Sequence, residues 1–143
     1  MRGMIYVLSM VIAATLFACS GGEKQGPQLA DVSGAWKASW SSMSGGGHSC
    51  SLTLTLTLTQ QGSAFTGSYT NAMVTCDGQS GGPVSGTVVN GTVHGDQVSF
   101  DLDTQALHQT GTVSPASMFG AATWTLSNGT TTITLTGNWA ATP

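Results

Sequence analysis

Residues 51–59 read Ser-Leu-Thr-Leu-Thr-Leu-Thr-Leu-Thr, an alternation of apolar and polar side chains without interruption. Successive side chains of a strand point to opposite faces of its sheet, so this period of two predicts a strand with leucines toward a core and threonines toward solvent. Left with free edges, such a strand would be prone to aggregate. We therefore expect it to be paired on both sides.

The rest of the chain beyond residue 31 also shows strand signals, separated by residues that favour turns. The expected strands are 34–41, 50–60, 64–72, 84–93, 97–104, 106–113, 119–127 and 131–140. Closure into an eight-stranded antiparallel up-and-down barrel buries one face of such a sheet and removes both edges, so we predict this all-β fold. A β-sandwich is the alternative. The Thr- and Ser-rich outer face argues against a membrane-spanning barrel.

Two hairpins carry the strong two-residue turn signals Asn128-Gly129 and Gly95-Asp96. In both cases a two-residue turn gives a register that gathers apolar side chains on one face. The expected pairs are Trp124 with Ile133, Ala122 with Leu135, Val93 with Val98, Gly91 with Phe100, and Val89 with Leu102.

The first 18 residues have the features of an export signal. Arg2 precedes an uncharged apolar stretch, residues 4–17, that is short for a transmembrane helix. The stretch leads into Leu16-Phe17-Ala18-Cys19, which resembles the lipobox of bacterial lipoproteins. The resemblance implies cleavage after residue 18, with a thioether-linked diacylglycerol and an acyl chain such as palmitate on Cys19 as a membrane anchor. An ordinary secretory signal followed by a stray cysteine is the alternative.

The residues after this cut divide into a tether and a domain. Residues 19–31 show no periodicity and predict a flexible tether, and residues 32–143 form the expected barrel domain. Ser20 at the second mature position resembles lipoproteins of the outer membrane, where the source has one. Lys24 and Lys37 are the basic residues after the cut, against six acidic ones. This balance excludes nucleic acid as a partner, since its phosphates require a cationic surface.

Cys50 and Cys76 are equidistant from Ser63, inside the turn expected between the second and third strands. They therefore face each other across one hairpin, and in an exported protein we predict a disulfide between them. Pairing the leucines with Tyr69 on the same face requires a register that differs by one residue, so we expect a bulge between Tyr69 and Cys76. The alternative, a metal site of two thiols with His48, lacks a fourth ligand.

The segment Gly34-Ala35-Trp36 at the start of the first strand resembles the lipocalin and avidin-like barrels, in which such a tryptophan closes one end. Residues 65–69, Phe-Thr-Gly-Ser-Tyr, and 137–139, Gly-Asn-Trp, are similar to the third and closing strands of avidin-like barrels. Lipocalins pack a late basic side chain against that tryptophan. The chain has no Lys or Arg after Lys37, so we expect Trp139 to take this place against Trp36.

Alternate connections of an up-and-down barrel lie at the same end. The links near 61–63, 95–96 and 114–118 form the expected closed end, and those near 42–49, 73–83, 105 and 128–129 form the other. The links 42–49 and 73–83 are long and rich in Gly and Ser, so they predict an open mouth.

Trp40, Tyr69 and Trp124 are expected to converge at this mouth, with His108 at its edge. An apolar cup with a few polar groups is typical of a small-molecule site. The alternatives are that the three aromatics fill the core and that His108 faces solvent. Asp101 has a neighbour of like charge, Asp103, on the same strand face. One interpretation is that the two carboxylates hold a cation. The commoner interpretation is that they face solvent as solubilising charge.

No serine-hydrolase elbow, metalloprotease helix, Walker loop or dinucleotide fingerprint is present in the sequence. We therefore expect that the protein is not an enzyme and that it holds no cofactor and no metal. The predicted function is a lipid-anchored lipoprotein of the cell envelope whose lipocalin-like barrel binds a small hydrophobic ligand. The alternative is a structural or protein-interaction module with a filled core.

Overall fold

The strand of alternating leucines and threonines is paired on both sides. It forms β2 (His48–Gln61), which lies antiparallel between β1 (Gly34–Gly45) and β3 (Ala64–Cys76). Its four leucines, at positions 52, 54, 56 and 58, are buried, and the threonines between them lie on the outer face. The prediction from the period of two is confirmed.

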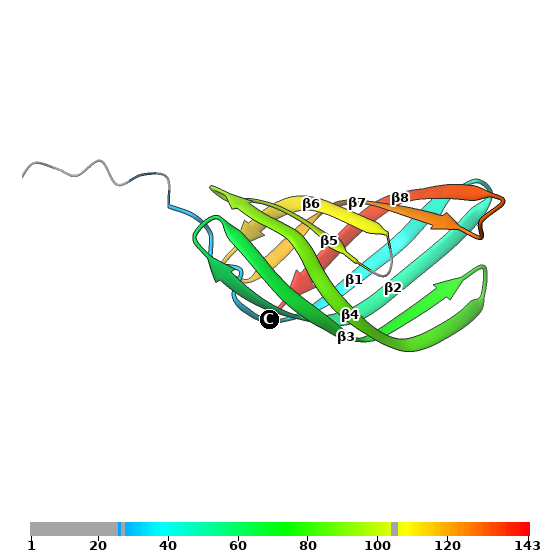
Figure 1. Cartoon of the computed structure of the whole chain (residues 1–143), viewed down its shortest axis with the longest axis horizontal. Coiled ribbons are helices and arrows are strands. Elements are labelled where there is room, and N and C mark those ends of the chain that lie inside the picture. The colour runs from blue at the N-terminus through cyan, green and yellow to red at the C-terminus, as the bar shows by residue number, and fades with distance from the viewer. Residues whose placement is uncertain (1–25, 27, 104–105) are drawn as a thin grey trace, which may run out of the picture.

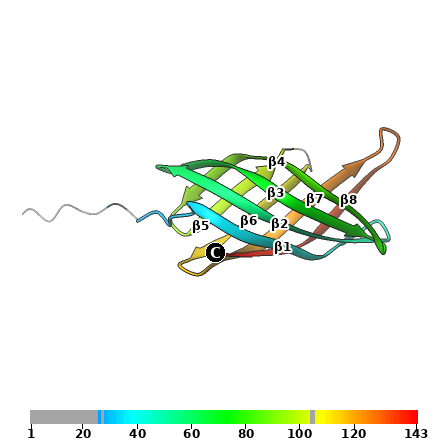
Figure 2. The same cartoon turned by 90° about the horizontal axis from the view of Figure 1, so that it is seen from below.

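The sheet closes on itself. This computed structural model describes residues 26, 28–103 and 106–143. Its other strands are β4 (Gln79–His94), β5 (Gln97–Leu102), β6 (Leu107–Ser114), β7 (Ser117–Ser127) and β8 (Thr132–Thr142). Each strand pairs with its neighbours in sequence and β8 pairs with β1, which gives an antiparallel up-and-down barrel (Figures 1 and 2). The predicted barrel is confirmed, and the β-sandwich alternative is wrong.

The two ends of the barrel differ. The closed end carries the links 62–63, 95–96 and 115–116, together with the described part of the N-terminal segment. The hairpin end carries the turns 46–47, 77–78 and 128–131 and the ends of β5 and β6. Figures 1 and 2 show that the hairpins β1–β2, β3–β4 and β7–β8 extend well beyond β5 and β6. At the hairpin end, β5 and β6 are therefore the strands that extend least.

The links expected at 42–49 and 73–83 are not long loops. β1 and β2 continue to a two-residue turn at Gly46-Gly47, and β3 and β4 continue to one at Asp77-Gly78. All four turn residues have positive φ. Such turns match the twist of the strands that they join. The expectation of a wide mouth with long loops was wrong because cross-strand pairing extends the strands through residues whose composition is typical of loops.

The predicted bulge in the β2–β3 hairpin is confirmed. Leu56 faces Tyr69 nearer the turn, and Cys50 faces Cys76 at the far end. The register shifts by one residue between these pairs, where Asn71 of β3 has a φ of 54°. One extra residue in β3 thus reconciles the leucine face with the cysteine pair.

The register of the β4–β5 hairpin is confirmed near its turn and wrong farther away. Val93 faces Val98 as predicted, but Val88, rather than Val89, faces Leu102. Asn90 lies in an intervening bulge with a φ of 55°. The expected pairing of Gly91 with Phe100 is absent for the same reason: the bulge displaces all later pairs by one residue.

The register of the β7–β8 hairpin differs from the prediction by two residues. Trp124 faces Leu135, and Leu126 faces Ile133. The connection spans residues 128–131 because the side-chain oxygen of Asn128 accepts bonds from the backbone N–H groups of residues 130 and 131. A shift of two leaves every side chain on its predicted face, because the period of a strand is two.

The N-terminal segment is packed across the closed end. The Val32 side chain is fully buried, and the Trp36 indole N–H donates to the Val32 carbonyl at 2.9 Å. The Ala30 N–H donates to the Gly95 carbonyl at 2.8 Å, and the Gln60 amide donates to the Ala30 carbonyl at 3.0 Å. The last residues of the expected tether therefore lie against the barrel.

Candidate functional site

The three predicted aromatic side chains lie inside the barrel rather than at its rim. Trp40, Tyr69 and Trp124 are 1%, 0% and 2% exposed. Each comes from an inward position of its strand, as the alternation requires. Their placement at a mouth was wrong because β1 and β3 continue for several residues past Trp40 and Tyr69.

The aromatic side chains pack on one another. The rings of Trp40 and Trp139 are stacked with centroids 6.2 Å apart and an interplanar angle of 22°. Phe100 meets Trp139 edge-on at 5.3 Å and contacts Phe65 in the same manner at 5.8 Å. Offset and edge-on arrangements of this kind are favourable between aromatic rings. The expected contact of Trp139 with Trp36 is replaced by stacking on Trp40, because the β1–β8 register sets Trp139 opposite Trp40.

Gln109 on β6 is the one polar side chain that is buried among the described residues. It faces Phe100 of β5 and Ala122 of β7, both of which are buried. The site predicted from the sequence did not include it. The signal was present in the alternation, because Gln109 lies two residues after Leu107 and therefore shares its inward face.

Four polar atoms of this interior have no hydrogen-bond partner among the described residues. They are the indole Nε1 atoms of Trp40 and Trp124 and both atoms of the Gln109 amide. The indole of Trp139, by contrast, donates to the Thr110 carbonyl at 3.0 Å. Polar groups buried in proteins are nearly always satisfied, so each of these four atoms calls for a partner.

We call the inward side chains that carry the unpartnered atoms, those of Trp40, Gln109 and Trp124, the polar layer. Trp124 is paired with Leu107, two residues from Gln109 on β6. Trp40 stacks on Trp139, whose indole reaches the backbone beside Gln109, at Thr110. The layer therefore offers N–H donors and one carbonyl acceptor within an apolar lining. No charged side chain among the described residues is buried with them.

His108 lies on the outer face and does not edge this interior. Its Nδ1 is hydrogen-bonded to a carboxylate oxygen of Asp101, and the other oxygen accepts from the Asn90 amide at 2.8 Å. Burial raises the pKa of Asp101, but the bonds from Asn90 and His108 outweigh it and hold the pKa below 3.8. The expectation that His108 borders a pocket with the three aromatics is wrong, because residue 108 alternates with the inward residues 107 and 109.

Asp103 has partners of its own on β4. Its carboxylate accepts from the backbone N–H of Thr87 at 3.0 Å and from the hydroxyl of the same residue. Each carboxylate thus has its own partners within the fold. In the described ranges, no group of three His, Cys, Asp or Glu side chains converges to hold a metal ion.

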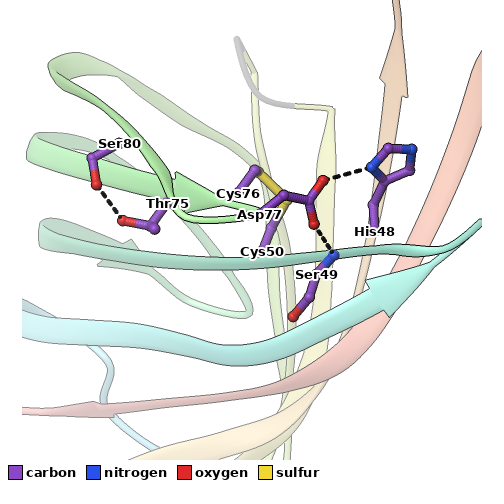
Figure 3. The surroundings of a disulfide bond; sticks show 7 residues. All are labelled: His48, Ser49, Cys50, Thr75, Cys76, Asp77 and Ser80. Atoms are coloured by element: carbon purple, nitrogen blue, oxygen red, sulfur yellow. Dashed lines mark hydrogen bonds and ion pairs between the residues drawn. A yellow bond between two sulfur atoms is a disulfide. The ribbon is translucent and has the colours of Figure 1, made fainter.

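The predicted disulfide between Cys50 and Cys76 is confirmed. It lies at the hairpin end beside a hydrogen bond between His48 and Asp77 (Figure 3). His48 Nδ1 is 2.6 Å from a carboxylate oxygen of Asp77, and the other oxygen accepts from the Ser49 N–H at 2.9 Å. These bonds, that of His48 first, lower the pKa of Asp77 below 3.8. With both sulfurs in the disulfide, the alternative metal site with His48 is wrong.

Two hollows lined by described residues lie away from the three aromatic side chains. One of about 590 Å³ lies at the closed end among Ala30, Trp36, Val113, Pro115 and Pro143. Another, of about 440 Å³, lies beside Asp101 and His108. Neither is lined by Trp40, Tyr69 or Trp124, so the three aromatics contribute to a packed core around the polar layer.

The lipobox and Cys19 lie outside the described residues, as do the expected signal peptide and the first part of the tether. Within the described part of the chain, no helix has the length and apolar character needed to cross a membrane. Comparison with protein-family models, with curated proteins and with solved structures found no match.

Proposed function

We propose that the chain is a lipid-anchored, non-enzymatic protein of the cell envelope whose barrel binds one small, neutral, mostly apolar molecule. The single observation that carries the binding proposal is the set of four buried polar atoms without partners, on Trp40, Trp124 and Gln109. The lipobox-like sequence ending in Cys19 supports the anchor, and Ser20 supports the outer membrane where the source has one.

The physical argument is the free energy of these groups. A buried polar group without a partner destabilises a fold by about 1–3 kcal/mol. Four such atoms together would lower the free energy of unfolding by a large fraction, since a small domain has a total stability of about 5–15 kcal/mol. A bound molecule with a hydrogen-bonding group offsets that destabilisation. The layer therefore supports a site for a guest, which would enter by displacing part of the packing between the aromatic rings.

The chemistry of the layer selects the guest. Its polar atoms are uncharged, and no charged side chain among the described residues is buried. Burying an ionised group there would be strongly unfavourable without a countercharge. The indole groups donate and the Gln109 amide both donates and accepts. A neutral ketone, ester or alcohol on an apolar body fits this pattern, whereas a carboxylate does not.

Prodan, a neutral fluorescent naphthalene ketone, tests this proposal on the chain that begins at Ser20. We expect saturable binding with a blue shift of its emission and quenching of tryptophan fluorescence. Gln109→Leu should weaken the affinity by about fivefold, since one hydrogen bond contributes roughly 1 kcal/mol. Gln61→Leu, on the exposed end of β2, is the matched control and should leave the affinity unchanged.

The anionic probe anilinonaphthalene sulfonate distinguishes a neutral site from general stickiness. We expect it to show no saturable binding. An absence of saturable prodan binding would contradict the proposal, and so would equal affinities for the Gln109→Leu and wild-type chains.

A second candidate function is a structural or protein-interaction module with a filled core. The observation that favours it is the burial of Trp40, Tyr69 and Trp124 with stacking on Trp139. This candidate predicts that neither probe binds saturably. It also predicts that crosslinkers placed on the hairpin end of the anchored chain recover one defined partner.

A further inference from the structure

The closed end of the barrel carries an exposed apolar patch on its outer face. Phe119, the third residue of β7, is 53% exposed. Its cross-strand neighbours are Thr112 of β6 and Ala140 of β8, and Ala121 follows on the same face. None of these side chains is charged, so covering the patch would require no charge to be desolvated.

The same end receives the chain from the expected anchor. The described N-terminal segment reaches the barrel at its closed end, where Ala30 is bonded to Gly95 (Figure 1). Cys19 precedes Leu29 by ten residues, and ten extended residues span at most about 35 Å. A bilayer that held the lipids on Cys19 would therefore lie within reach of the closed end.

We propose that the patch around Phe119 rests on the bilayer, with the Phe119 ring inserted among the lipid headgroups. This inference rests on the lipid anchor of the proposed function and does not depend on the interior site. The hollow between Trp36, Pro115 and Pro143 opens at the same end, and its lining also includes Asp31. Apolar aromatic rings are favoured at the interface between headgroups and acyl chains.

The tether decides which apolar surface meets the bilayer. Met73 and Val84 are also exposed, at 43% and 42%, but they lie in the hairpin-end parts of β3 and β4. A tether attached at the closed end raises the local concentration of lipid at Phe119 rather than at Val84. Docking at Phe119 thus leaves the hairpin end, with its disulfide, pointing away from the membrane.

The test uses the full lipidated chain in phosphatidylcholine vesicles, with an NBD fluorophore attached to Phe119→Cys. The matched control carries the same label on Val84→Cys, which is likewise exposed but lies toward the hairpin end. We expect a several-fold rise in emission and quenching by doxyl-labelled lipid for the label at 119. The label at 84 should remain accessible to aqueous iodide.

Flotation of the same samples separates the two proposals. If the chain floats with the vesicles but the label at 119 stays as accessible to iodide as the label at 84, the docking proposal is overturned and the anchor stands. If the chain does not float, the anchor is wrong and the docking proposal falls with it. Saturable prodan binding by the unlipidated chain is unaffected by either result.

Discussion

Gln109 is a polar residue in an apolar part of the barrel interior. It occupies an inward position between Phe100 and Ala122, where the alternation of β6 would otherwise favour an apolar side chain. Both atoms of its amide lack a partner among the described residues. A side chain that lowers stability at such a position is typical of a binding site, where function and stability oppose each other.

Replacing Gln109 by Leu should therefore stabilise the unliganded barrel. We expect the free energy of unfolding to rise by about 1–3 kcal/mol, because two unsatisfied polar atoms give way to an apolar side chain of similar size. Urea unfolding followed by tryptophan fluorescence measures the change, with the exposed Gln61→Leu as control. A loss of stability in Gln109→Leu would mean that the amide is satisfied in the native barrel.

Asp77 connects stability to pH at the hairpin end. Its bonds to His48 and Ser49 favour the ionised carboxylate in the folded chain and place its pKa below 3.8. A lowered folded pKa stabilises the fold above the unfolded pKa, and this contribution is lost as pH falls through the folded pKa.

Asp77→Asn removes this contribution. We expect the variant to melt at a lower temperature than wild type near neutral pH, with the difference shrinking below about pH 4 as the wild-type carboxylate is protonated. Circular dichroism melts at several pH values provide the measurement. A difference between the two chains that stays constant from neutral pH to about pH 2 would contradict this assignment.

At the scale of the elements, inward glycines make room for the large side chains. A Cβ on Gly91 of β4 would lie 2.3 Å from the Phe65 carbonyl oxygen and 2.6 Å from the Phe65 ring. Gly111 of β6 lies in the same way under the Trp139 ring. Neighbouring strands thus alternate between a large side chain and none, which lets a narrow barrel hold several aromatic rings.

Gly91→Ala should disturb the pairing of β3 with β4. We expect a loss of about 1–3 kcal/mol in the free energy of unfolding, because the added methyl group meets backbone that cannot move freely. Gly81→Ala is the control on the same strand, since a Cβ there meets nothing within 4 Å. Equal stabilities of the two variants in urea would show that the contact with Phe65 is relieved at little cost.

The disulfide joins β2 and β3 at the ends farthest from their turn. It closes a loop over a sequence separation of 26 residues. Replacing both Cys50 and Cys76 by Ser should lower the free energy of unfolding by about 2–4 kcal/mol through the greater freedom of the unfolded chain. Reduction of the wild-type disulfide should give the same shift in the urea midpoint. Unchanged midpoints after both treatments would contradict this role.

At the scale of the molecule, the N-terminal segment completes the barrel. Val32 enters the closed end and its carbonyl accepts from Trp36. The segment therefore orients the barrel relative to the tether, which a freely attached linker would not do.

Val32→Asp should release this segment without unfolding the strands, because a charged side chain is not accommodated in the buried position. We expect hydrogen exchange at the Ala30 amide, which donates to Gly95, to rise to the rate of an open chain. Ala35→Asp, at an exposed position of β1, should leave that amide protected. Continued protection in Val32→Asp would show that the segment is held by its other bonds.

The period of two in the sequence determined the strands, the inner and outer faces, and the number of elements that had to close into a barrel. It also placed Cys50 opposite Cys76 and required the bulge near Asn71, because face and register are local consequences of strand geometry. The same alternation put the side chains of Trp40, Tyr69 and Trp124 on the inner face, although their expected position at a mouth was wrong.

Only the tertiary structure decided where along the barrel these residues lie. Pairing between strands extended the hairpins through Gly- and Ser-rich segments, and the bulge at Asn90 displaced the β4–β5 register. The hydrogen-bond partners of a buried polar group such as the Gln109 amide come from side chains on distant strands. A local sequence pattern does not contain this information. Strand faces follow from neighbours in sequence, whereas partners and ends follow from closure of the whole sheet.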